Sequence, residues 1–208
     1  MTDTILFQEP GVTIAYDDQA HTLAPYGRSV RPDGDVNHGF IDLRDRPELV
    51  HSIPEANASP GLQKILVALN RKGSRFMSLG CERGVFFENN AANWPVSIGS
   101  YTTVVFRDFE ANRSKEDFVA LSRSIWKDFK PKSSERPVLL ELIVEPLKAL
   151  FHVTPAFSLE LKLIALGRSE SEANDTFEWL AASISEVIDR LAQVPGPELD
   201  QAGSVDRP

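Results

Sequence analysis

The sequence predicts an α+β fold, an antiparallel sheet with its helices packed on one face. Residues 157–166 alternate large apolar and polar side chains, as an antiparallel strand with one solvated face does. Residues 172–192 carry apolar side chains at spacings of three and four, which indicates a helix with one buried stripe. Elements that each have one buried face pack as two layers. The expected element order is α-β-β-β-α-β-β-α, after an N-terminal β-hairpin and an irregular segment.

Residues 1–58 supply that hairpin and that irregular wrapping segment. Residues 12–16 alternate apolar and polar side chains, and a turn at 17–19 is expected before the next short strand. Over residues 25–60, prolines and glycines recur with little periodicity. An irregular stretch of this length either wraps the surface, with a short strand at 40–43, or is partly mobile.

The α+β core domain is expected over residues 59–193. Ser59-Pro60 begins a helix, because serine caps helix N-termini and proline fits the first helical position. Two short strands, 75–79 and 85–88, flank Gly80-Cys81-Glu82-Arg83-Gly84, where glycines at both ends are typical of a hairpin loop. A third strand, rich in β-branched residues, follows a polar loop.

The second half of the core continues with a helix, two strands and a helix. Ser114-Lys115-Glu116-Asp117 is similar to a capping box and begins the second helix. Strands at 138–145 and 157–166 form an antiparallel pair, and the last helix runs to about Ala192. Few apolar residues follow it, so residues 194–208 are predicted to be a disordered tail.

Charge and composition exclude several functional classes. The formal net charge is −8, divided as −6 over residues 1–58, +4 over 59–130 and −6 over 131–208. An acidic chain is repelled by nucleic acid and anionic lipid, so nucleic-acid binding is disfavoured and no membrane partner is expected. No apolar run suits a spanning helix, no secretory signal is visible, and the single cysteine cannot form an internal disulfide. These features predict a cytoplasmic protein.

Cys81 is the first candidate for chemistry. A thiol in a glycine-bounded loop can be exposed, and Arg83 two residues later would lower its pKa. A nucleophile also needs a base within reach, and the histidines are distant in sequence. We therefore prefer the interpretation of a small apolar residue in a turn. The rival interpretation requires a cleft that joins Cys81, Glu82, Arg83, His38 and His152.

Two acidic patterns have simpler structural explanations. Asp33-Gly34-Asp35 begins like a calcium loop, but histidine and arginine stand where that loop needs glycine and glutamate. Glu141, Glu145 and Glu160 share paired strands, where the solvated face of a sheet explains them. The common nucleotide, hydrolase and zinc-protease signatures are missing from the sequence. No catalytic residue, metal or cofactor is therefore predicted.

Aromatic residues and arginines alternate within the expected three-strand segment. Phe86 and Phe87 are adjacent, so in a regular strand they point to opposite faces. One of them lies outside the main core unless the N-terminal segment or another subunit covers it. Aromatic and arginine side chains on a sheet can anchor a protein partner, although core packing is the commoner fate. The possible interaction surface comprises Phe86, Phe87, Trp94, Tyr101, Arg83 and Arg107.

The order of elements over residues 59–192 resembles that of type III secretion chaperones and the related YbjN-like fold. Those families are small acidic intracellular proteins that bind other polypeptides, often as dimers. The resemblance rests on element order alone, and the N-terminal 58 residues depart from it. The expected function is a non-catalytic intracellular binding or accessory protein that uses a protein–protein surface, toward a protein partner or in self-association. The alternative is an enzyme or small-ligand-binding protein with a cleft near Cys81, Glu82 and Arg83.

Overall fold

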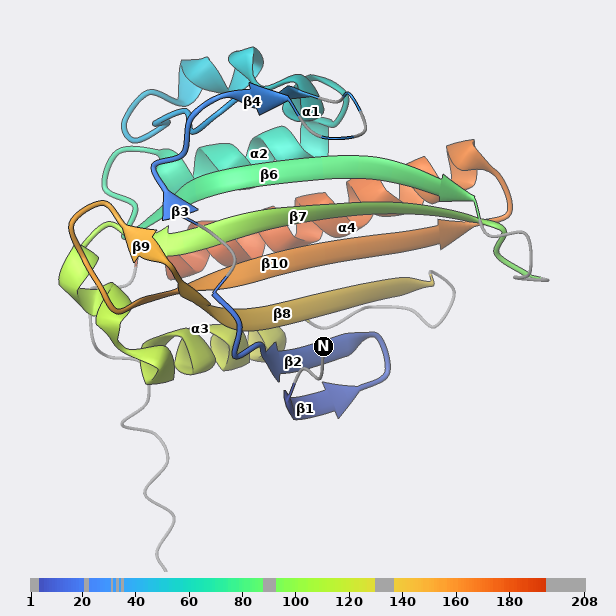
Figure 1. Cartoon of the computed structure of the whole chain (residues 1–208). Helices are drawn as coiled ribbons and strands as arrows, with labels where there is room; N and C mark the ends of the chain where they lie inside the picture. The colour runs from blue at the N-terminus through green and yellow to red at the C-terminus, as the bar shows by residue number, and fades with distance from the viewer. Residues whose placement is uncertain are drawn as a thin grey trace, which may run out of the picture.

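One six-stranded sheet organises the chain in the computed structural model, which describes residues 4–20, 23–30, 32, 34, 36–87, 93–129 and 137–193. The strand order is β1-β2-β8-β10-β7-β6, so β1 and β6 are the edges (Figure 1). The predicted tail, His21, Asp33 and Asp35 lie outside the described residues. The strand bounds are β1 Thr4–Glu9, β2 Val12–Tyr16, β6 Phe76–Phe87, β7 Val96–Phe106, β8 Val138–Leu147 and β10 Ala156–Gly167.

The sheet is mixed rather than wholly antiparallel. Four neighbouring pairs are antiparallel, namely β1–β2, β8–β10, β10–β7 and β7–β6. The remaining pair, β2–β8, is parallel, with Val12 opposite Leu140 and Tyr16 opposite Val144. A parallel pair needs a long connection between its strands, and here more than a hundred residues separate them. No local sequence signal marks such a pairing.

Three long helices cover one face of this sheet, and the predicted α+β class is confirmed (Figure 1). Each begins at a serine whose hydroxyl accepts a hydrogen bond from a backbone N–H three residues later, which stabilises the first turn. The predicted caps at Ser59 and Ser114 are therefore confirmed, and Ser169 caps the last helix. The helices are α2 Pro60–Asn70, α3 Lys115–Asp128 and α4 Glu170–Leu191.

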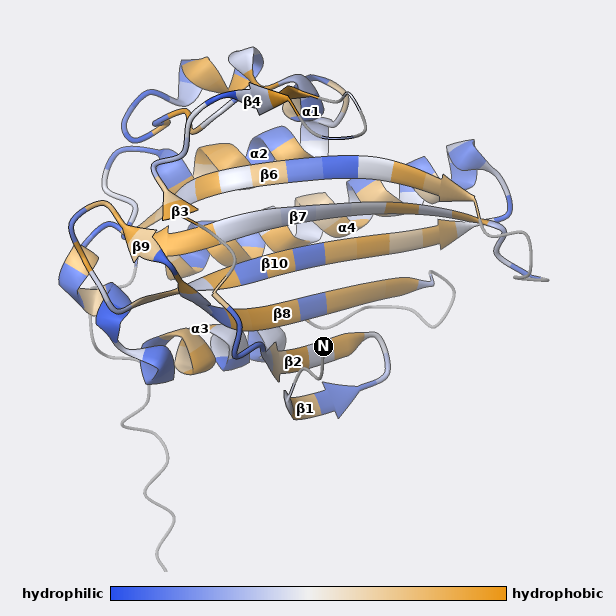
Figure 2. Ribbon diagram, in the orientation of Figure 1, coloured by the Kyte–Doolittle hydropathy of each residue, from blue (hydrophilic) through white to orange (hydrophobic). Residues whose placement is uncertain are grey.

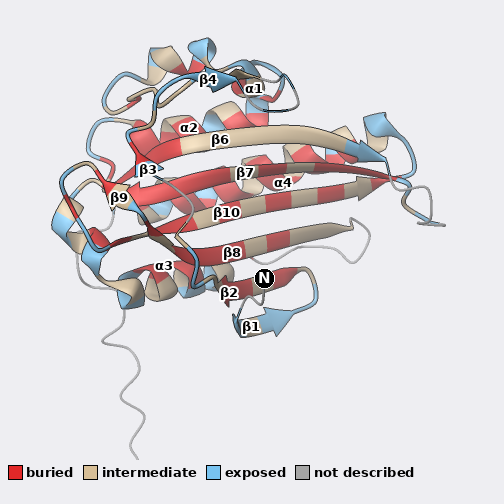
Figure 3. Ribbon diagram, in the orientation of Figure 1, coloured by how far each residue is buried: buried red, intermediate tan, exposed pale blue. Residues whose placement is uncertain are grey.

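The main core lies between these helices and the sheet. On β10, Leu159, Leu161 and Leu163 are buried in one cluster with Phe177 and Leu180 of α4. The residues between those leucines point to the other face, so apolar and polar bands alternate along the strand (Figure 2). Burial is deepest in the middle strands, whereas β1 and the end of β6 are exposed (Figure 3).

The predicted hairpin at Gly80–Gly84 is wrong, because these residues continue a single strand. β6 pairs with β7 from Phe76 to Phe87, with one register shift between Ser78 and Gly80. The two glycines are sites of close approach. A Cβ on Gly80 would lie 2.5 Å from the Tyr26 hydroxyl, and a Cβ on Gly84 would lie 2.9 Å from the Phe86 ring. Between α2 and α3, the described residues thus form two long strands in place of the three that were expected.

The N-terminal hairpin forms, but its turn is earlier than predicted. β1 and β2 meet at Pro10-Gly11, and Gly11 has a φ of 81°, which favours glycine. The predicted strand at 40–43 is also wrong, because this stretch has no regular structure. β2 joins the same sheet as the core strands, so the N-terminal residues extend that sheet.

Residues 23–30 and 36–43, called the strap, lie on the side of the sheet that faces away from the long helices. The strap contains the two-residue strands β3 Leu23–Ala24, β4 Ser29–Val30 and β5 Val36–Asn37. β3 pairs with β9 Ala149–Leu150, and Tyr26 donates its hydroxyl to the Leu79 carbonyl at 3.2 Å.

The short helices are η1 Pro47–Ser52, α1 Pro54–Asn57 and η2 Phe109–Arg113. Among the described residues, no helix combines the length and apolar character that crossing a bilayer requires.

Candidate functional site

The face of the sheet that points away from the long helices is only partly covered. The strap lies over the end of this face where β6 begins, whereas the end where β6 terminates stays open (Figure 1). We call the uncovered half the open face. Strand register places its side chains in rows that cross the sheet, because cross-strand partners share a face. One row contains Gly84, Gly99, Ile164 and Leu139, and the next contains Glu82, Tyr101, Lys162 and Glu141.

A glycine pair forms a hollow on the open face. Gly84 and Gly99 are direct cross-strand partners, and the Phe86 ring lies over both of them. A Cβ on Gly99 would lie 3.5 Å from that ring and 4.0 Å from Ile164, which is ordinary van der Waals contact. The hollow has a volume of about 260 Å³. Phe86 is nevertheless 57% exposed, so it offers an apolar surface to the solvent.

The neighbouring row, called the acidic row, carries ionisable side chains on four strands. Tyr101 donates its hydroxyl to Glu82 Oε2 at 3.2 Å. Lys162 lies opposite both Tyr101 and Glu141, and its Nζ is 3.0 Å from Glu160 Oε1. Glu141 makes no side-chain hydrogen bond or ion pair within the described chain. Together with Glu160, this part of the face carries three carboxylates and one ammonium group, a net charge of −2.

A second depression continues from the acidic row to beneath the strap. It has a volume of about 620 Å³, and Tyr26 and Gly27 of the strap form one wall. Thr103 and Glu160 belong to the sheet side of this depression. Tyr101 and Lys162 line both depressions, so the hollow and this second space form one groove along β7 and β10.

The residues of the rival cleft are only partly brought together. Cys81 and His38 line one small pocket of about 70 Å³ between the strap and β6, together with Glu55. Burial, and then the negative charges of Glu55 and Glu82, raise the pKa of the Cys81 thiol to about 12. The thiolate is therefore scarce at neutral pH, and the thiol is a poor nucleophile there.

The other rival residues point elsewhere. Glu82 lies on the open face. Arg83 lies on the helix face, where it donates to Asn174 Oδ1 at 2.7 Å and its guanidinium is 5.1 Å from the Phe177 ring centroid. His152 packs edge-on against the Phe109 ring. Among the described residues, no three His, Cys, Asp or Glu side chains form a group that could hold a metal ion.

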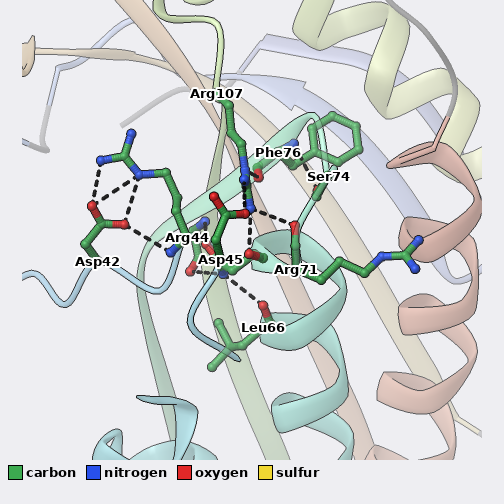
Figure 4. A network of polar contacts seen from close by, with 10 residues as sticks. Asp42, Arg44, Asp45, Leu66, Arg71, Ser74, Phe76 and Arg107 are labelled. Carbon is green, nitrogen blue, oxygen red and sulfur yellow. Dashed lines mark hydrogen bonds and ion pairs between the residues drawn. The ribbon is translucent and has the colours of Figure 1, made fainter. Parts of the chain in front are cut away.

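Arg107 occupies a structural position far from the open face. Its guanidinium donates to the carbonyls of Asn70, Arg71 and Phe76 at 2.5, 2.8 and 2.9 Å, and pairs with Asp45 at 2.7 Å (Figure 4). Those carbonyls lie at the end of α2 and the start of β6. Phe86 lies at the other end of β6, so Arg107 and Phe86 cannot belong to one surface patch. Arg107 thus fixes a helix end.

The predicted interaction residues are divided among several places. Phe86 and Tyr101 belong to the open face. Phe87, 66% exposed, is at the same end of β6 but points to the other side of the sheet. Trp94 is half-buried beneath the Arg168 guanidinium, which is 5.6 Å from its ring centroid.

Sequence reasoning missed Gly84, Gly99 and Ile164 as parts of a site. Glycines inside a strand pattern were the available signal, since they mark a close backbone approach.

The expectation that Glu145 is solvated is wrong. It is 5% exposed and accepts a hydrogen bond from Ser158 Oγ at 3.2 Å.

Comparison with known proteins gives no further guide to the site. No family model, curated protein or solved structure matches the chain. The resemblance to secretion chaperones rested on an element order with three strands between the first two core helices, and the described residues form two strands there.

Proposed function

We propose that this protein is a non-catalytic binding or accessory protein that acts inside the cell through a protein–protein surface on the open face. One observation carries the proposal. The long helices cover one side of the sheet, and on the other side Phe86 is 57% exposed beside a hollow over Gly84 and Gly99. Exposed apolar surface beside a depression, bordered by polar side chains, is typical of a protein interaction site.

The chemistry of the described side chains supports a binding role. The single thiol has a raised pKa and lies in a pocket of about 70 Å³. Arg83 donates to Asn174 Oδ1, and Arg107 donates to backbone carbonyls at the end of α2. One cysteine that cannot make an internal disulfide suits a reducing compartment, which favours the cytoplasm.

A small-ligand function is the second candidate. It is favoured by the depression of about 620 Å³ between the strap and the sheet, in which Lys162 and Glu160 offer polar contacts. This function would use Glu82 and Tyr101 at the open end of the groove, rather than Cys81. A small molecule would then raise the melting temperature of the purified protein, since ligands of the native state stabilise it.

Affinity capture with matched variants tests the interaction proposal. Phe86→Asp places a charge on the open face, while Ile5→Asp places the same charge at an equally exposed position on β1, also 57%. We expect a stoichiometric protein partner, or a second copy, to be retained by the wild type and by Ile5→Asp but lost by Phe86→Asp. Retention of the same partner by both variants would contradict the proposal, as would a turnover activity that survives in Phe86→Asp.

A further inference from the structure

We infer that the open face binds an extended segment of another protein in which a basic residue stands two positions from a large apolar one. The inference rests on the proposed function and names the chemistry of the partner. It combines two adjacent features of the groove: the hollow over Gly84 and Gly99, and the acidic row that contains Glu82 and Glu141.

The spacing follows from strand geometry. Gly99 and Tyr101 are two residues apart on β7, and Ile164 and Lys162 are two residues apart on β10. Each row is thus one two-residue repeat, about 6.7 Å, from the next. An extended segment lying along these strands repeats its side chains on one face at the same interval. If one residue of the segment lies over the hollow, the residue two positions along the segment therefore lies over the acidic row.

The hollow selects an apolar side chain. It is lined by the Phe86 ring, which lies over the backbone of Gly84 and Gly99, and by Ile164. The Gly99 side of the hollow has room, because a Cβ there meets neighbours only at 3.5 Å and beyond. Burial of an apolar group against the exposed Phe86 ring removes both surfaces from water.

The acidic row selects a basic side chain and disfavours a second copy of this chain. Glu82, Glu141 and Glu160 outweigh Lys162, and Glu141 has no ion-pair partner among the described residues. A symmetric face-to-face dimer would bring two copies of this net charge of −2 together, and like charges at an interface are costly. The net charge of the whole chain, −8, also attracts cationic segments.

Selection from a phage-displayed library of random dodecapeptides on the immobilised full chain tests the inference. We expect enriched peptides to carry Lys or Arg two positions from Leu, Ile, Phe or Trp. One enriched peptide, labelled for fluorescence anisotropy, should bind about tenfold more weakly to the double variant Glu82→Gln and Glu141→Gln at low salt. Added salt should weaken its binding to the wild type.

A second variant fills the hollow and leaves the charge of the acidic row unchanged. Gly99→Val fills the hollow with a β-branched residue that suits a strand, so circular dichroism should show an intact fold while the peptide is lost. Ile5→Ser is the matched control and should retain full affinity. Enriched peptides that lack a basic residue but are lost on Gly99→Val would overturn the inference and leave the proposed function standing. Peptides that bind Gly99→Val and the wild type equally would overturn both.

Discussion

Cys81 shows how a thiol that looks reactive in sequence can have a raised pKa in the fold. Its neighbours Gly80 and Arg83 suggested an exposed thiol with a lowered pKa. In the structure the side chain packs against the buried cluster that contains Leu62 and Leu66, and Arg83 is occupied by Asn174. Burial favours the uncharged thiol, so the pKa rises instead of falling.

This raised pKa predicts a specific dependence of stability on pH. The folded-state pKa of about 12 lies above the ordinary thiol value near 9. The contribution of this pKa difference to the free energy of unfolding is therefore complete below pH 9 and is lost as the pH rises toward 12. Over that range the free energy of unfolding of the wild type should fall by about 1 kcal/mol per pH unit more than that of Cys81→Ala. Urea unfolding at several pH values measures this difference, and parallel curves for the two proteins would contradict it.

Phe86 is the residue of the open face whose exposure the sequence came closest to predicting. Its adjacency to Phe87 required that one of the two leave the main core, and both are in fact more than half exposed. What the sequence could not show is the support beneath the ring. Gly84 is two residues away, but Gly99 belongs to the next strand and meets Phe86 only through the register of the β6–β7 pair.

At the scale of elements, the patterns that could be predicted were those set by local periodicity. α4 and β10 each show one buried stripe or face, so their positions followed from spacing alone. β6 was divided wrongly, because glycines at both ends of residues 80–84 imitate the signals of a hairpin turn. The cause at Gly80 is long-range, since Tyr26 of the strap approaches it, whereas Gly84 meets the Phe86 ring two residues along the same strand. The parallel β2–β8 pairing is non-local in the same way.

The junction between α2 and β6 depends on Arg107, whose importance is also invisible in sequence. Its four acceptors lie on three different segments, and the side chain is 18% exposed. Arg107→Met leaves the carbonyls of Asn70, Arg71 and Phe76 without this donor. We expect a loss of about 3 kcal/mol in the free energy of unfolding, measured by urea titration.

A matched control separates this network from an ordinary surface charge. Arg190 is 55% exposed and approaches Asp128 at 3.8 Å, so Arg190→Met should cost less than about 1 kcal/mol. Equal losses for the two variants would show that the Arg107 contacts do not stabilise the junction.

At the scale of the whole molecule, the two faces of the sheet differ in what covers them. The helix face holds the main core, which includes residues of α2, α3 and α4. The second face is divided between the strap and the open face, and the groove passes from one to the other along β7 and β10. A sheet that displays an apolar hollow beside an acidic row suits the proposed binding of a segment of opposite charge.

Photo-cross-linking is the measurement that tests this central claim most directly. Benzoylphenylalanine is placed at position 86 on the open face and, in a second protein, at position 5 on β1, where the native side chains are equally exposed. In cells that produce the protein, we predict a covalent adduct with one discrete polypeptide from position 86 and none from position 5. Adducts formed equally from both positions, or from position 5 alone, would contradict a binding role for the open face.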